Sequence, residues 1–80
     1  MSFVYFLQST PYRHKRYVGL TDDVDARLKK HNSGSVRSTS GYRPWKVVLV
    51  LRFEDKDKAV QFERYLKSAS GRAFAKRHFW

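Results

Sequence analysis

The sequence predicts one small domain of mixed α/β structure, with three strands and three helices in the order β-β-α-β-α-α over residues 1–80. Residues 3–7 are a continuous apolar run of strand length, and Trp45 to Phe53 is a longer segment dense in β-branched residues. Arg16 to Asn32 has the pattern of a short strand that leads directly into an amphipathic helix. Beyond residue 58, apolar residues recur at helical spacing.

The first strand, residues 3–7, has two apolar faces because side chains alternate along a strand. One face carries Phe3, Tyr5 and Leu7, and the other carries Val4 and Phe6. A polar segment leads to the second strand, Arg16 to Thr21, so an antiparallel pair is expected. In a suitable register, Tyr5 and Tyr17 stand side by side. Gly19 weakens this strand unless another group must approach the backbone there closely.

The first helix follows this strand, with Thr21 or Asp22 as its expected N-cap and Gly34 as its stop. Acidic residues crowd its first turn and basic residues its last, as the helix dipole favours. Arg27 and His31 are spaced i and i+4, so they lie together at the edge of the apolar stripe. A permanent cation and a titratable base are therefore expected beside the tyrosine-bearing strand.

The rest of the chain supplies a loop, a strand and two helices. Residues 33–44 form a basic loop rich in Ser, Thr and Gly. Trp45 to Phe53 is dense in β-branched residues and is expected to be the central strand. A helix over residues 58–68 is expected to end at Ser70-Gly71, before a last helix over residues 72–78. The expected apolar stripe of the longer helix is Ala59, Phe62, Leu66 and Ala69.

The charge balance indicates a polyanionic partner. Seventeen Lys and Arg against seven Asp and Glu give a net charge of +10, which favours nucleic acid first and an anionic membrane surface second. A membrane-surface helix needs a broad apolar face, and here those faces also have to close the core. No apolar run approaches the roughly 18 residues of a membrane span, and the N-terminus lacks the order of a secretory signal. We therefore expect a cytoplasmic protein that does not bind membranes.

Glu63 occupies an unusual place, within the apolar stripe of its helix between Ala59 and Leu66. A carboxylate there is costly unless it is paired or binds a cation. It could form an ion pair with Arg27 or Arg64, or lie at the edge of the stripe and reach water. It could also be the ligand of a hard divalent cation, which keeps several waters when only one or two carboxylates bind it.

Taken together, these residues resemble the signature of the GIY-YIG nuclease domain. The first signature element appears as Val4-Tyr5-Phe6, in place of Gly-Ile-Tyr, and the second as Tyr17-Val18-Gly19. Arg27 and His31 follow at the family's spacing on the next helix, and Glu63 follows on the helix after the third strand. Each residue alone has an ordinary structural interpretation, but five positions in the right order make a specific match.

The resemblance covers roughly residues 2–76 and is closest to the small stand-alone members of the family. It implies a three-stranded antiparallel sheet flanked by helices. It also implies metal-dependent hydrolysis of DNA phosphodiester bonds, in DNA repair, recombination or the processing of structured DNA. One Mg²⁺ or Mn²⁺ would be held by Glu63.

The resemblance also assigns roles to the other signature residues. Tyr17 would activate the attacking water, with His31 near enough to take or relay its proton. Arg27 would bind the scissile phosphate and stabilise its developing charge. Tyr5 would orient the phosphate or the water, and Gly19 would let the substrate backbone approach. Preorganised charge is usually the largest single contribution to such catalysis.

Basic residues outside the signature are the candidate contacts to DNA phosphates. They are Lys29, Lys30, Arg37, Arg43, Lys67, Arg72 and Lys76. Such contacts position a nucleic acid without reading its sequence, and specificity would come from the basic loops, a homodimer or a partner protein. DNA is favoured over RNA as the partner. The alternatives are a non-catalytic nucleic-acid-binding module of the same fold and a basic RNA-binding accessory protein. Only the nuclease requires a metal and Glu63.

Overall fold

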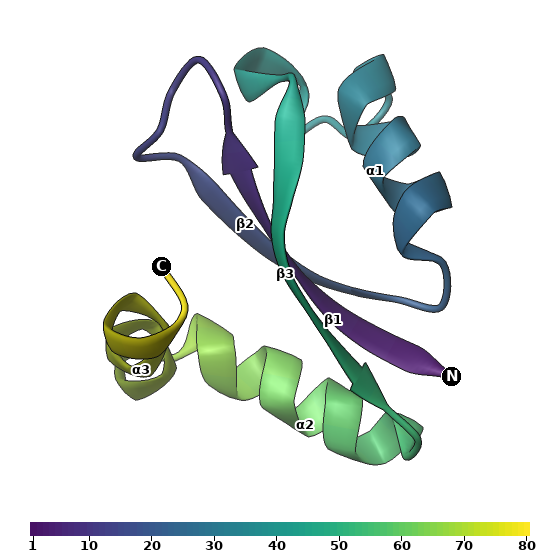
Figure 1. The fold of residues 1–80 in the computed structure, drawn as a ribbon, viewed down its shortest axis with the longest axis vertical. Helices are drawn as coiled ribbons and strands as arrows, with labels where there is room; N and C mark the ends of the chain where they lie inside the picture. The colour runs from purple at the N-terminus through teal and green to yellow at the C-terminus, as the bar shows by residue number, and fades with distance from the viewer.

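An antiparallel sheet of three strands, in the order β2-β1-β3, organises the computed structural model, which describes residues 1–80 (Figure 1). The strands are β1 (Ser2–Ser9), β2 (Arg16–Thr21) and β3 (Trp45–Phe53). The helices are α1 (Val24–Ser33), α2 (Lys56–Lys67) and α3 (Ala69–His78), and a 3-10 turn, η1 (Ser40–Tyr42), precedes β3. The predicted fold class and element order are confirmed. None of the helices combines the length and the apolar character needed to cross a membrane.

The central strand is β1, so the prediction that Trp45 to Phe53 lies in the middle of the sheet was wrong. Residues 4–7 of β1 are all buried, as expected of a strand that is covered on both faces. In β3 only Trp45 is buried, and Val48 and Val50 are exposed. The density of β-branched residues indicated a strand correctly but did not indicate its place in the sheet.

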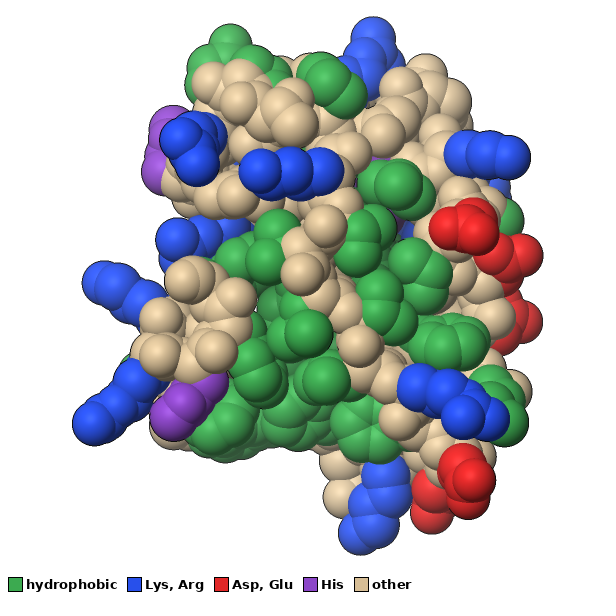
Figure 2. All heavy atoms as spheres, viewed as in Figure 1, with side chains coloured by type: hydrophobic (Ala, Val, Ile, Leu, Met, Phe, Trp, Pro, Cys, Tyr) green, Lys and Arg blue, Asp and Glu red, His purple; other side chains and the backbone are tan.

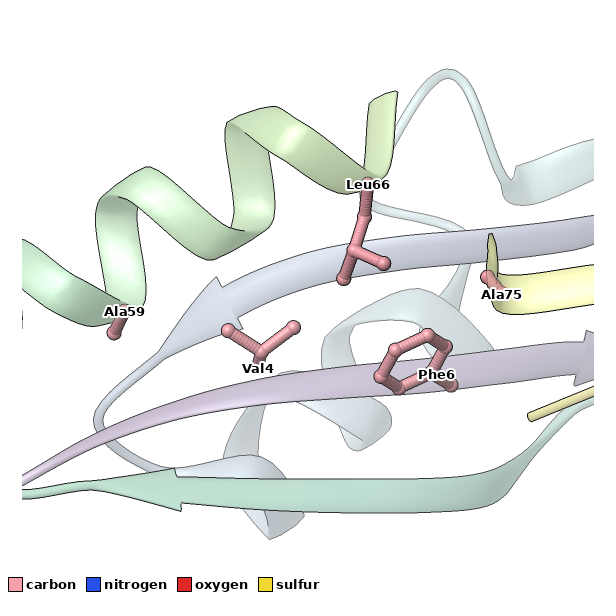
Figure 3. Packing of buried hydrophobic residues seen from close by; sticks show 5 residues of the cluster. All are labelled: Val4, Phe6, Ala59, Leu66 and Ala75. Atoms are coloured by element: carbon pink, nitrogen blue, oxygen red, sulfur yellow. The ribbon is translucent and has the colours of Figure 1, made fainter. Parts of the chain in front are cut away.

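Two separate cores lie on the two faces of the sheet, as the alternation along β1 predicted. On one face Val4 and Phe6 pack against residues of α2 and α3, namely Ala59, Leu66 and Ala75 (Figure 3). On the other face Tyr5 and Leu7 pack with Trp45 against α1. Each large apolar side chain buried in this way contributes roughly 1.5–3 kcal/mol to stability. Tyr5 is thus held on the α1 side of the sheet.

Helix α1 begins one or two residues later than its sequence suggested. Asp23 is the N-cap, and its side chain accepts a hydrogen bond of 3.0 Å from the backbone N–H of Ala26. The hydroxyl of Thr21 instead accepts from the backbone N–H of Asp23, which makes the turn before the helix. Gly34 ends the helix with a φ of 85°, in the left-handed region that favours glycine, as predicted.

The boundary between the last two helices differs from the prediction. Helix α2 ends at Lys67, and the hydroxyl of Ser68 caps α3 by accepting from the backbone N–H of Gly71. Gly71 therefore lies inside α3 rather than at a helix stop. A Cβ on Gly71 would overlap the carbonyl of Tyr65, so the glycine permits the tight turn between the helices. Ala69 is exposed and does not complete the apolar stripe of α2.

Candidate active site

The predicted catalytic residues of β1, β2 and α1 lie on the face of the sheet that α1 covers. Tyr5 stands opposite Gly19 in the β1–β2 register. Tyr17 lies on the same face, with its ring centroid 6.1 Å from that of Tyr5, so the expected pair of tyrosines is present. Arg27 and His31 reach the same place from α1.

His31 is fully buried, and both of its ring nitrogens are hydrogen-bonded. The Tyr5 hydroxyl lies 2.9 Å from Nε2, and Oγ1 of Thr39 lies 2.8 Å from Nδ1. The Thr39 hydroxyl itself donates to the carbonyl of Val36 at 3.3 Å, so it accepts from Nδ1–H of His31. This network assigns the proton to Nδ1. Nε2 is then the acceptor for the hydroxyl of Tyr5.

The burial and charge of the cluster fix its protonation states. Burial lowers the pKa of His31, and the neighbouring Arg27 guanidinium lowers it further, so the imidazole is neutral at pH 7. Burial raises the pKa of Tyr5, with a hydrogen bond from Arg27 acting in the opposite direction. The Tyr5 hydroxyl in turn raises the pKa of Arg27, which is permanently charged. A fixed cation therefore lies beside a neutral donor–acceptor pair.

The hydrogen bond of His31 goes to Tyr5 and not to Tyr17. We expected His31 to serve Tyr17 as a proton acceptor, and the two rings are near each other, with centroids 4.8 Å apart. However, the Tyr5 hydroxyl already occupies Nε2. Tyr17 is half-buried, whereas Tyr5 is only 1% exposed. Of the two hydroxyl groups, that of Tyr17 belongs to the more accessible side chain.

Gly19 has a different role from the one we expected. The residue is buried, and the Tyr5 phenol lies directly against it. A Cβ at this position would overlap the hydroxyl and ring of Tyr5. The space left by the missing side chain is thus filled by Tyr5 and is not open to the substrate backbone. Gly19 allows Tyr5 to reach His31.

Glu63 lies on α2, and its ion-pair partner is Lys67, one turn along the same helix, rather than Arg27 or Arg64. The Glu63 side chain is 15% exposed, while that of Lys67 is 54% exposed. Nζ of Lys67 also lies 5.9 Å from the centroid of the Tyr17 ring. Lys67 therefore contacts both the predicted metal ligand and the accessible tyrosine, around the outer edge of β2.

The donor groups fit a hard divalent cation bound through a single carboxylate. The structure has no group of three or more His, Cys, Asp or Glu side chains that could enclose a metal, which argues against a zinc-type site. Mg²⁺ commonly uses only one or two carboxylates and keeps its waters. Glu63 retains some exposure, and Lys67 is a flexible, half-exposed partner that can move away from it.

The predicted phosphate contacts do not form one surface. Three of them, Lys67, Arg72 and Lys76, line a groove between β2 and the last two helices. Lys29 and Lys30 are exposed on α1, away from this groove. The remaining two, Arg37 and Arg43, are exposed in the loop that follows α1. Figure 2 shows basic side chains around the rim of one face, with the acidic ones gathered along one side.

Two residues of this region were missed in the sequence. Thr39 is buried and binds His31, but it lies in a loop with several other Ser and Thr residues, where no pattern distinguishes it. Trp80 lines the groove beside Arg72 and Lys76. Its position beside cations depends on how α3 meets β2, which the local sequence does not indicate.

The three-stranded sheet and the cluster of Tyr5, Tyr17, Arg27 and His31 define a small domain of the GIY-YIG type. Residues 1–77 match the model of the GIY-YIG catalytic domain. The chain belongs to the GIY-YIG family, whose nucleases generally depend on a divalent metal.

Two relatives are fungal proteins named structure-specific endonuclease subunit SLX1. The protein of Debaryomyces hansenii is 39% identical over 71 residues, which is 80% of this chain and 20% of that protein. The protein of Scheffersomyces stipitis is 42% identical over 67 residues, which is 75% of this chain and 20% of that protein. The chain thus spans about a fifth of the length of these relatives.

A bacterial relative is closer to this chain in length. The UPF0213 protein BH0048 of Halalkalibacterium halodurans is 40% identical over 57 residues, which is 70% of this chain and 61% of that protein. The solution NMR structure of UPF0213 protein BH0048 from Bacillus halodurans superposes with a TM-score of 0.56 at 31% identity. That superposition covers 99% of this chain and 87% of the other. The predicted fold is confirmed by this structure.

Proposed function

We propose that the protein is an endonuclease that hydrolyses phosphodiester bonds in branched or otherwise structured DNA, with Mg²⁺ or Mn²⁺ as its metal. The proposal depends on one observation: Tyr17, Arg27 and the Tyr5–His31 pair lie together on one face of the sheet. Lys67 connects this cluster to Glu63 around the edge of β2. The net charge of +10 supports a DNA substrate. The name of the SLX1 relatives supports a structured one.

The chemistry of phosphodiester cleavage requires an activated water, a Lewis acid and a cation on the phosphoryl oxygens. A divalent cation bound at Glu63 would supply the Lewis acid. Arg27 binds the scissile phosphate and stabilises the charge that develops on it. Tyr17, once its hydroxyl has released its own proton to solvent, accepts the proton of the attacking water, because its side chain is the more accessible of the two tyrosines. The Tyr5 hydroxyl, itself hydrogen-bonded to His31, helps to position Arg27.

The proposal is tested by incubating the protein with supercoiled plasmid and labelled branched DNA, in Mg²⁺, Mn²⁺ or chelator. Glu63→Gln keeps the size of the side chain but removes its charge, and Glu54→Gln is the matched control on an exposed carboxylate. We expect cleavage that requires metal and survives in Glu54→Gln but not in Glu63→Gln. Absence of metal-dependent cleavage, or equal activity of Glu63→Gln, would refute the proposal.

A second candidate is a nucleic-acid-binding module that has lost catalysis. The ion pair between Glu63 and Lys67 favours it, since it gives the carboxylate a structural partner without any metal. Such a module binds DNA with the same salt dependence, because counterion release follows from charge alone. It differs from the nuclease in one result: the DNA stays intact with or without metal, both in the parent and in Glu63→Gln.

We further propose that the domain acts in DNA repair or recombination together with a second copy or a partner protein. The SLX1 relatives are named as subunits, which supports this view. All seven candidate phosphate contacts are exposed cations that position DNA without reading its sequence. A partner is therefore the natural source of specificity. Sedimentation of the purified chain with and without branched DNA tests for self-association.

A further inference from the structure

A groove of about 490 Å³ lies between the outer edge of β2 and helices α2 and α3. Four cations line it, and no acidic side chain does. These cations are Arg16, Lys67, Arg72 and Lys76. The other lining residues are apolar or aromatic and include Tyr17 and Trp80. Such a surface combines positive charge with flat apolar groups.

Contacts with the core hold the Trp80 ring in place, and a planar cation lies over one face of the ring. Phe6 packs against it with ring centroids 5.5 Å apart and an angle of 69° between the rings. The backbone N–H of Trp80 donates to the carbonyl of Ala75 at 3.0 Å, which anchors the residue to α3. The guanidinium of Arg16 lies over the ring, 4.9 Å from its centroid. The Trp80 face thus accepts a planar group in stacking geometry.

We propose that this groove binds an unpaired strand of DNA, with its phosphates on the four cations and one base stacked on Trp80 in place of the Arg16 guanidinium. A cationic groove combined with aromatic platforms is the arrangement that binds single-stranded nucleic acid without sequence preference. The bases of an intact duplex stack on one another, so they offer no free face to Trp80. The chemistry of the groove therefore favours a single strand over a duplex.

The groove is continuous with the candidate active site. Tyr17 and Lys67 line the groove, and Lys67 also contacts Glu63. A strand that follows the groove would pass Tyr17 and bring a phosphate to Arg27 and Glu63. This placement deepens the proposed function, on which it rests, because it assigns the unpaired arm of a branched DNA to one surface. Binding itself requires neither metal nor cleavage.

The test measures binding in chelator, by the anisotropy of a short labelled DNA strand at several salt concentrations. Arg72→Gln and Lys76→Gln remove groove cations. Arg77→Gln is the matched control, because this exposed residue carries the same charge on the same helix but does not line the groove. We expect each groove variant to bind more weakly and to lower the slope of log K against log salt by about 0.7, the value for one phosphate of a single strand. Arg77→Gln should bind like the parent.

Tryptophan fluorescence gives a second measurement. Trp45 is 5% exposed, so quenching by DNA reports on the half-buried Trp80. We expect quenching in the parent, and Trp80→Leu should abolish it and weaken binding at least about fivefold, in line with the loss of one stacked base. If Trp80→Leu does not fold, as judged by circular dichroism, the Arg72, Lys76 and Arg77 series decides the question.

Several results would overturn the inference. Equal losses in Arg77→Gln and in the groove variants would show that only net charge matters. Tighter binding of a duplex of equal length, or of RNA of the same sequence, would show that the ligand is not an unpaired DNA strand. The outcome is separable from that of the proposed function. If the protein binds DNA through the groove but never cleaves it, only the proposed function is refuted. If it cleaves DNA but the groove variants bind like the parent, only this inference is refuted.

Discussion

The hydroxyl of Tyr5 lies 2.9 Å from Nε2 of His31, in a place where neither side chain is more than 1% exposed. This hydrogen bond joins the central strand to α1 through the core. Because Thr39 occupies Nδ1, the imidazole can only accept from Tyr5 at Nε2. The cluster is therefore a structural element of the fold as well as a part of the candidate active site.

Tyr5→Phe should destabilise the protein and reduce cleavage. The substitution leaves Nε2 of His31 buried without its donor, and a buried polar group without a partner costs about 1–3 kcal/mol. Urea unfolding measures the free energy of unfolding. Tyr12→Phe is the control, since Tyr12 is exposed and its hydroxyl makes no hydrogen bond in the structure. Equal stability of the two variants would show that the Tyr5–His31 hydrogen bond does not contribute.

Stability should fall as the solution is made acidic, because the pKa of His31 is lowered in the folded state by burial and by Arg27. The unfolded chain has an ordinary histidine pKa of about 6.5 and takes up the proton first. The stabilising contribution of the neutral imidazole is thus fully present above about pH 6.5. It is lost as the pH falls from there through the lower folded-state pKa. Urea midpoints measured from pH 8 down to pH 5 show this loss.

His31→Gln should remove most of that pH dependence, at the expense of stability at neutral pH. His14→Gln and His78→Gln are the controls, because both residues are exposed and should leave the dependence unchanged. Cleavage should fall in the same pH range, since a protonated His31 can no longer accept from Tyr5. A pH profile of stability that is the same in His31→Gln as in the parent would assign the effect to other groups.

The periodicity of apolar residues was sufficient to predict the elements and the face on which each residue of β1 lies. It was not sufficient to place the strands in the sheet. Residues 4–7 and the β3 segment are both rich in apolar residues, and only pairing on both sides makes β1 central. Position in a sheet is set by hydrogen bonds between segments far apart in the chain. Local composition does not encode those bonds.

In the candidate site too, the sequence predicted contacts within one element but not contacts between elements. Arg27 and His31 share a helix face at i and i+4, and so do Glu63 and Lys67, so their proximity follows from helix geometry. Contacts between elements were not predictable in this way. The sequence suggested that His31 serves Tyr17, but the β1–β2 register and the absence of a side chain at Gly19 bring Tyr5 to it instead.

Gly19→Ala should impair both folding and activity. Its Cβ would overlap the Tyr5 phenol, which cannot retreat because it is buried against His31. We expect a loss of roughly 1–3 kcal/mol in unfolding free energy, as for overpacking of a core. Gly41→Ala is the matched control, because nothing lies within 4 Å of the Cβ that it would add. A fully active Gly19→Ala would show that the position of Tyr5 is not critical.

Lys67 should compete with a divalent cation for Glu63. The ammonium group pairs with the same carboxylate that would bind the metal, so removing it frees the ligand. Pairs at i and i+4 on a helix contribute about 0.2–0.5 kcal/mol, so Lys67→Met should tighten Mn²⁺ binding about twofold. The enhancement of water proton relaxation on Mn²⁺ binding, in the absence of DNA, measures this affinity without depending on cleavage. In Glu63→Gln the binding should be lost.

The control for Lys67→Met is Lys58→Met, which removes an equal charge from an exposed position on the same helix. If the two variants tighten Mn²⁺ binding equally, the effect is that of net charge alone and Lys67 does not compete for Glu63.

If only Lys67→Met tightens Mn²⁺ binding, Lys67 connects the metal ligand Glu63 to the groove that binds DNA. Once the metal has displaced Lys67 from Glu63, its ammonium group is free for a phosphate in the groove that it lines. In that case metal binding and DNA binding should each strengthen the other, and Lys67→Met should abolish this coupling.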